Sequence, residues 1–174
     1  MIWISIISLV FLFLIAVSDI KRRLIPIIYL LVETIVSLSI GYNLIGMSIM
    51  KSTITNLVII TFQIMILWGW IKIRGGNSGN SLWSKFGKGD LFMLAISAIN
   101  LSALNYLFFT IFVCIVSIII WIGFLTIQKI KNQTIPFAGF LAVGIMILRI
   151  FQITGNASNY YSDNFILNLI YGIY

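Results

Sequence analysis

Long apolar runs constrain the fold of this chain more than any other feature. They recur from the N-terminus onward, each about 16 to 22 residues long, which is the length that an α-helix needs to cross a lipid bilayer. Only 9% of the residues are charged, whereas soluble domains carry roughly 25% charged residues. The chain cannot cover a soluble surface, and we therefore predict an all-α polytopic membrane protein.

The positions of the apolar runs predict one domain over residues 1–174, built as a bundle of about six transmembrane helices. The expected helices cover residues 2–18, 25–44, 53–71, 91–99 extended by a turn or two, 106–127 and 135–153. Asn100 and Asn105 mark the expected turn between the fourth and fifth helices. Residues 72–89 are predicted to form a loop, mobile over 75–81, and residues 155–174 a tail on the opposite side.

The basic residues predict an orientation. Those after the first, third and fifth expected helices are Lys21, Arg22, Arg23, Lys72, Arg74, Lys85, Lys88, Lys129 and Lys131. The opposite side holds only Lys51 and, by this interpretation, Arg149. Cytoplasmic loops carry the excess of lysine and arginine. We therefore expect a multi-pass protein of the cytoplasmic membrane with its N-terminus outside and lipids around it.

The composition excludes several kinds of chemistry. The chain has no histidine, which excludes Ser-His-Asp and Cys-His nucleophilic catalysis and imidazole metal sites. Its one cysteine, Cys114, lies in an apolar run and cannot form an internal disulfide or a Cys-x-x-Cys site. The net charge of +7 comes from the short loops, without a basic face carrying stacking aromatics, so nucleic acid is not an expected partner. Carboxylates, hydroxyls and lysines remain, and no metal or cofactor is expected.

Two of the four acidic residues lie at helix ends. Asp19 closes the first expected helix and Asp90 opens the fourth, with one helical hairpin between them. Parity therefore brings both carboxylates to the same, cytoplasmic face. Glu33 lies inside the second expected helix, where an ionisable side chain is a functional candidate or a partner in a structural hydrogen bond.

The segments around the aspartates resemble motifs of the type IV prepilin peptidases. Asp19 is followed by the basic stretch 21–23 and Ile-Pro at 25–26, as in their first motif. Residues 87–90 read Gly-Lys-Gly-Asp and resemble the second, the Gly-x-Gly-Asp signature, with Leu-Ala at 94–95. The stretch 135–144, which begins with Ile-Pro-Phe, resembles a third, at the start of a late helix. The three motifs occur in order, and the resemblance covers the chain up to about residue 153.

This resemblance implies a membrane aspartic endopeptidase that removes the basic leader from prepilin-like, pseudopilin-like or preflagellin-like substrates at the cytoplasmic face. It implies Asp19 and Asp90 as the catalytic pair. Supporting positions in the motifs are Gly87, Gly89, Pro26 and Pro136. Larger members of the family carry a cysteine-bearing cytoplasmic domain and N-methylate the product. This chain has no room for that domain, so we expect no methyltransferase activity. It departs from the family pattern at Ile27, usually asparagine, and at Phe92, usually lysine.

A carboxylate pair hydrolyses a peptide bond when one member is ionised and the other protonated, which two close carboxylates favour. Asp90 at a helix N-terminus is the expected base and Asp19 at a helix C-terminus the expected acid. Gly87 and Gly89 are expected to let the backbone turn sharply and approach a substrate closely.

Other functions remain open at this point. Asp19, Glu33 and Asp90 are also compatible with a carboxylate-lined transporter or proton pathway, and the chain with a non-catalytic scaffold. Structural roles are available as well, because Asp90 fits a helix cap and Asp19 fits an ion pair with Arg22 or Arg23.

Overall fold

The computed structural model describes residues 2–74, 87–128, 135–154 and 160–163, and these residues form six helices. The helices are α1 (Ile2–Arg22), α2 (Ile27–Ile45), α3 (Ser48–Arg74), α5 (Lys88–Asn100), α6 (Ala103–Gln128) and α7 (Phe137–Ile153). Each lies where the sequence predicts one, and the all-α class is confirmed.

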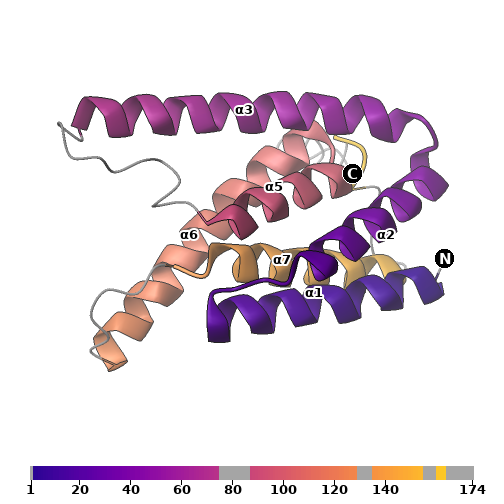
Figure 1. Ribbon diagram of the computed structural model, residues 1–174. Coiled ribbons are helices and arrows are strands. Elements are labelled where there is room, and N and C mark those ends of the chain that lie inside the picture. The colour runs from indigo at the N-terminus through magenta and orange to yellow at the C-terminus, as the bar shows by residue number, and fades with distance from the viewer. Residues whose placement is uncertain (1, 75–86, 129–134, 155–159, 164–174) are drawn as a thin grey trace, which may run out of the picture.

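Four helices are long and apolar enough to cross a membrane, namely α1, α2, α3 and α6. The protein therefore has the build of a multi-pass membrane protein. Helices α5 and α7 are shorter, with 13 and 17 residues. At a rise of about 1.5 Å per residue, α5 is roughly 20 Å long, less than the hydrocarbon core of a bilayer. Helix α5 contacts α2, α3, α6 and α7, so the longer helices surround the shortest one (Figure 1).

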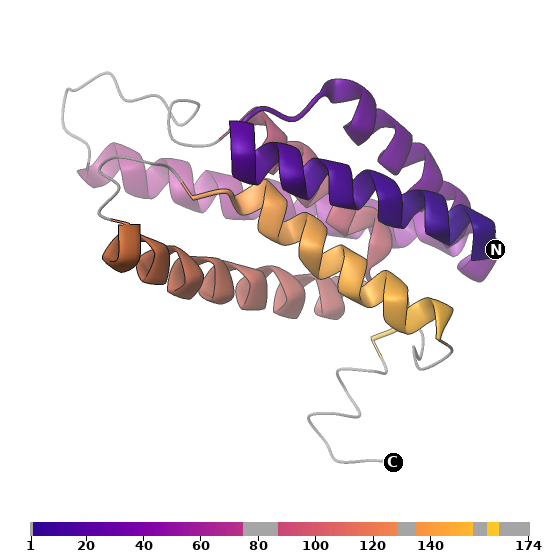
Figure 2. The same ribbon diagram turned by 90° about the horizontal axis from the view of Figure 1, so that it is seen from below.

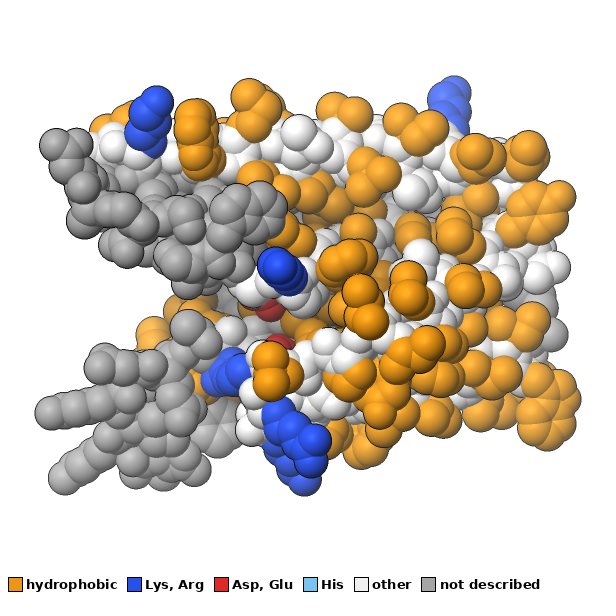
Figure 3. Space-filling view, in the orientation of Figure 1, with side chains coloured by type: hydrophobic (Ala, Val, Ile, Leu, Met, Phe, Trp, Pro, Cys, Tyr) orange, Lys and Arg blue, Asp and Glu red, His pale blue; other side chains and the backbone are white. Residues whose placement is uncertain are grey.

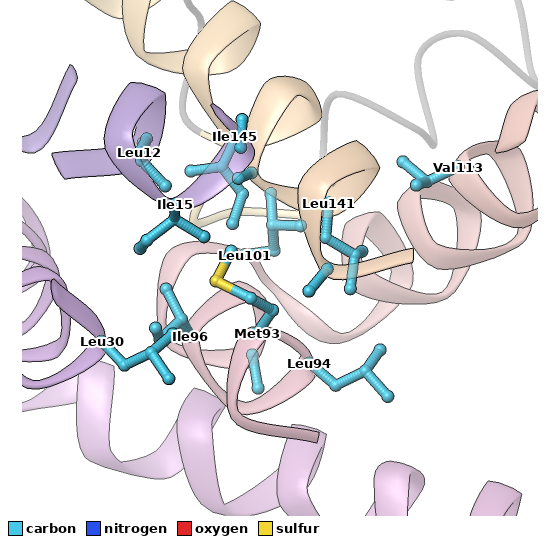
Figure 4. Packing of buried hydrophobic residues seen from close by; sticks show 14 of the residues in the cluster. Leu12, Ile15, Leu30, Met93, Leu94, Ile96, Leu101, Val113, Leu141 and Ile145 are labelled. Carbon is cyan, nitrogen blue, oxygen red and sulfur yellow. The ribbon is translucent and has the colours of Figure 1, made fainter. Parts of the chain in front are cut away.

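Helices α1 and α7 lie side by side and antiparallel (Figures 1 and 2). Between them and α5 is a layer of apolar side chains, fully or almost fully buried (Figure 4), comprising Leu12, Ile15, Met93, Ile96, Leu141 and Ile145. Hydrophobic side chains spread over the side of the molecule seen in Figure 3, and every long apolar helix exposes large ones. A hydrophobic exterior over a packed core is what a lipid environment requires of a helical bundle.

Several helix ends differ from the prediction. Helix α3 begins at Ser48, so Lys51 lies in its first turn and not in a loop. The turn between α5 and α6 consists of Leu101 and Ser102, and Asn105 lies inside α6. The expected loop 72–89 is partly helical, because α3 continues to Arg74 and α5 starts at Lys88. Its expected mobile part and most of the expected tail 155–174 lie outside the described residues.

Candidate active site

The structure brings the two aspartates together at the start of α7. The backbone N–H of Ala138 donates to Asp90 Oδ1 at 2.8 Å, and the N–H of Gly139 donates to Asp19 Oδ2 at 2.7 Å. Because neighbouring backbone nitrogens bind the two carboxylates, standard bond lengths keep the bound oxygens within about 9 Å of each other. Acidic surface is visible there in a hollow flanked by basic side chains (Figure 3).

Each aspartate is placed by its own helix. Asp19 lies in the last turn of α1, which ends where Arg23 adopts a left-handed backbone with φ 56° and donates its N–H to Asp19 O at 3.1 Å. Asp90 is the third residue of α5, and its Oδ2 accepts the N–H of Gly87 at 3.1 Å. One oxygen of Asp90 therefore caps its own helix, as a residue at this position commonly does. The other oxygen binds α7.

The environment of Asp90 favours a shared proton. Burial raises the pKa of Asp90; the N–H of Ala138 lowers it, and the negative charge of Asp19 raises it. The N–H of Gly87 and the Arg23 guanidinium lower the pKa as well. The Arg23 guanidinium carbon lies 5.0 Å from the centre of the Trp121 ring, a cation–π arrangement that holds this charge near the site. A carboxylate with a raised pKa beside a second carboxylate is the arrangement found in acid–base pairs.

The motif glycines leave room for neighbouring side chains. The sharp turn that we expected to need their backbone freedom is not seen at Gly87. Gly87 has φ −68° and ψ 142°, an ordinary extended conformation. A Cβ on Gly87 would lie 3.1 Å from Asp90 Oδ2, and one on Gly89 2.9 Å from Ile25 Cδ1. The two motif prolines, Pro26 and Pro136, are the N-caps of α2 and α7.

The site also depends on a residue whose role the sequence did not reveal. Gly139 contributes its N–H to Asp19, and a Cβ at this position would lie 3.2 Å from the same carboxylate oxygen. Gly139 belongs to the late Ile-Pro-Phe stretch, so the motif was visible in the sequence. The hydrogen bond from its backbone amide could not be predicted from the sequence, because every residue other than proline carries the same backbone N–H.

Glu33 is not brought to the aspartate pair. Its side chain is fully buried and its Oε1 accepts hydrogen bonds from Ser8 at 2.8 Å and Ser37 at 3.0 Å. Ser8 precedes Asp19 by eleven residues on α1, a rise of about 16 Å along the helix. Leu12 and Ile15, both fully buried, lie between Ser8 and Asp19 on α1. An auxiliary role of Glu33 at the pair itself is therefore not supported by its position.

The two departures from the family pattern lie on the surface. Ile27 is 62% exposed and Phe92 45% exposed. Among the described residues, no group of three or more His, Cys, Asp and Glu side chains is arranged to hold a metal ion.

Comparisons of the chain with family models, with curated proteins and with solved structures gave no match. The assignment of a function therefore depends on the three motifs and on the geometry around the aspartates.

Proposed function

We propose that this protein is a membrane aspartic endopeptidase that removes a basic leader peptide from prepilin-like or preflagellin-like substrates and does not methylate the product. The observation that carries the proposal is the pair of hydrogen bonds from Ala138 to Asp90 and from Gly139 to Asp19. They hold the carboxylates of the first and second motifs at the first turn of α7, which begins within the third motif. All three motifs thus contribute to one site.

The chemistry follows from two carboxylates sharing one proton. The ionised carboxylate removes a proton from water, and the water oxygen bonds to the scissile carbonyl carbon. The protonated carboxyl donates its proton to the carbonyl oxygen. The C–N bond then breaks, and the departing amine takes a proton from the carboxyl that received one. One hydroxyl of the tetrahedral intermediate returns its proton to the other carboxylate, which leaves a carboxylic acid product and restores the pair with its single shared proton. The sequence argument assigns Asp90 as the base and Asp19 as the acid. The Gly139 amide stabilises the Asp19 anion, and the negative charge of Asp19 raises the pKa of Asp90. These two contacts favour the reverse assignment, with Asp19 as the base and Asp90 as the acid.

The proposed orientation places the aspartate end of the bundle in the cytoplasm and the N-terminus outside. Lys21 and Arg22 end α1, and Lys72 and Arg74 end α3, on the aspartate side. The buried position of Arg149 removes one of the two basic residues counted for the opposite side. Lys51 is then the one exposed basic residue that we assign to the opposite side, and this excess of basic residues on the aspartate side supports the proposed orientation.

The proposed bundle has six membrane-embedded helices, of which α5 and α7 end below the membrane surface inside the protein. Helices α3 and α6 extend past the ends of α1 and α5 at the aspartate end (Figure 1). The carboxylates then lie in a recess just inside the inner leaflet. A substrate whose own apolar helix lies in the membrane presents the peptide bond before that helix at this depth. The proposed partners are accordingly membrane-anchored substrates.

Co-expression with a prepilin-like substrate tests the proposal. Leader removal is expected with the unchanged protein and is expected to be lost in Asp19→Asn and in Asp90→Asn separately. Asp163→Asn is the matched control, because Asp163 accepts the N–H of Leu104 at 3.0 Å through one oxygen, which asparagine retains. Cleavage that persists in either of the first two variants refutes the proposed function.

A further inference from the structure

A second buried polar cluster lies on the other side of the apolar layer. At its centre are Glu33 on α2, fully buried, and Arg149 on α7, 3% exposed. The Arg149 Nη1 donates to Gln152 Oε1 at 2.9 Å, and its Nη2 contacts Asn100 Oδ1 and donates to Ser37 Oγ at 3.4 Å. Buried charges inside a membrane protein are expensive and are normally paired.

Ser37 links the two charges. Its hydroxyl donates to Glu33 Oε1 at 3.0 Å and accepts hydrogen bonds from Asn100 Nδ2 at 3.0 Å and from Arg149. Ser8 on α1 donates to the same glutamate oxygen. The hydrogen bonds through Ser37 run from the cation toward the carboxylate, as an ion pair relayed by this hydroxyl needs. It joins four helices, α1, α2, α5 and α7.

The spacing of this cluster from the aspartate site is the same on three helices. Ser8 precedes Asp19 by eleven residues on α1, Asn100 follows Asp90 by ten on α5, and Arg149 follows Gly139 by ten on α7. Each interval corresponds to about 15 or 16 Å of helix. Polar contacts therefore join the three helices of the aspartate site at two levels. Between these two levels the helices pack through apolar side chains.

We propose that Glu33, Ser37 and Arg149 form a serine-relayed ion pair that fixes the axial position of α7 against α1 and α5, and that they are positioning residues for the Asp19–Asp90 pair. Their effect on proteolysis depends on the proposed function, whereas the positioning itself does not.

The physical reason is that apolar packing alone specifies helix register weakly in a membrane. Lipid tails are as apolar as leucine, so a sliding helix loses little hydrophobic free energy. A slip of α7 by one turn, about 5.4 Å, would separate Arg149 from Ser37 and Asn100 and leave a charge buried without partners. The same slip would withdraw the amides of Ala138 and Gly139 from the aspartates.

Spin labels measure this register without any catalytic step. The label sites are Ile20→Cys on α1 and Ile147→Cys on α7, exposed by 52% and 49%, in a Cys114→Ser background. The distance between the labels follows any axial movement of α7. Ser37→Ala deletes a single oxygen of the relay. Ser39→Ala is the matched control, since Ser39 is half-buried and its hydroxyl donates within α2, to Ile35 O at 2.9 Å.

Ser37→Ala, Glu33→Gln and Arg149→Gln are each expected to broaden the distance distribution or shift it by a few Å, up to about 5 Å for a full turn. Ser39→Ala is expected to leave it unchanged. An unchanged distribution in Ser37→Ala overturns the inference, and this variant is expected to fold because only a hydroxyl is removed.

Thermal unfolding in detergent tests the pairing of the charges. Glu33→Gln together with Arg149→Gln is expected to unfold at a higher temperature than Arg149→Gln alone, because no lone carboxylate remains buried. Additive losses in the double variant contradict an ion pair. Cleavage that survives Asp19→Asn refutes the proposed function and leaves the distance results untouched, so the two failures are distinguishable.

Discussion

Replacing Gly139 by alanine adds one methyl group where α7 crosses α1, at the residue whose amide holds Asp19. The new Cβ would lie 3.2 Å from Asp19 Oδ2, 3.3 Å from Ile20 Cγ1 and 3.4 Å from Ala16 O. Two of these distances are tighter than ordinary van der Waals contact and the third is at its edge. The carbonyl of Ala16 belongs to a helix backbone and cannot rotate away. Helix α7 must therefore move away from α1 by a few tenths of an ångström.

The expected cost has two opposing parts. Overpacking a tight interior contact costs about 1–3 kcal/mol. Alanine stabilises a helix by up to about 1 kcal/mol relative to glycine. We therefore expect the free energy of unfolding to fall by roughly 1–2 kcal/mol. The displacement also lengthens the 2.7 Å hydrogen bond to Asp19. Hydrogen bonds to charged groups contribute about 1.5–3 kcal/mol, so losing half of one in the transition state slows cleavage roughly four- to thirteenfold.

Unfolding in detergent measures the first effect and leader cleavage by purified protein measures the second. Gly69→Ala is the control, because an added Cβ there meets no described atom within 4 Å. It is expected to preserve both stability and cleavage. A Gly139→Ala protein as stable and as active as the Gly69→Ala protein would show that the close approach of α7 to α1 does not hold the site.

Two further outcomes follow from the structure. The pKa of Asp90 is raised above its usual value of 3.8, mainly by burial, so the folded state holds this proton more tightly than the unfolded state. Stability should then fall as the pH rises above about 4, and it should fall less in Asp90→Asn, which thermal unfolding across a pH series measures; parallel pH profiles would refute this. Asn56→Ala removes the donor to Ala98 O at 2.9 Å and Leu101 O at 2.7 Å, and leaving one buried carbonyl unpaired costs about 1–3 kcal/mol. Asn43→Ala, at an exposed site, should cost much less in the same assay.

Local features of the sequence predicted the helices well. The length of an apolar run and the charges at its ends are properties of one segment, and they fix whether it forms a membrane helix. The order of the helices then placed Asp19 and Asp90 at one end of the bundle. The predicted helix ends were less accurate. Helix α3, for example, begins at Ser48 and includes Lys51, because a helix can extend past its apolar run into polar residues.

The partners of each polar side chain were decided only by packing. Arg149 was counted among the loop charges, yet it lies buried with Ser37 and Asn100. The sequence groups Glu33 with the aspartates, yet Glu33 bonds to Ser8, which the buried Leu12 and Ile15 separate from Asp19 along α1. In a membrane protein the outward face of a helix is as apolar as its inward face, so the sequence pattern does not reveal how the helix is rotated.

Apolar length and charge are properties of consecutive residues, so the sequence alone predicts a helical membrane protein with two carboxylates at helix ends. The packing of the helices brings the first turn of α7 to both carboxylates, and about 15 Å further along the bundle it joins Glu33, Ser37 and Arg149 in a buried polar cluster. Backbone amides have the same chemistry at every residue other than proline. Which amides meet a carboxylate therefore depends on how helices pack, and that is set by the whole bundle.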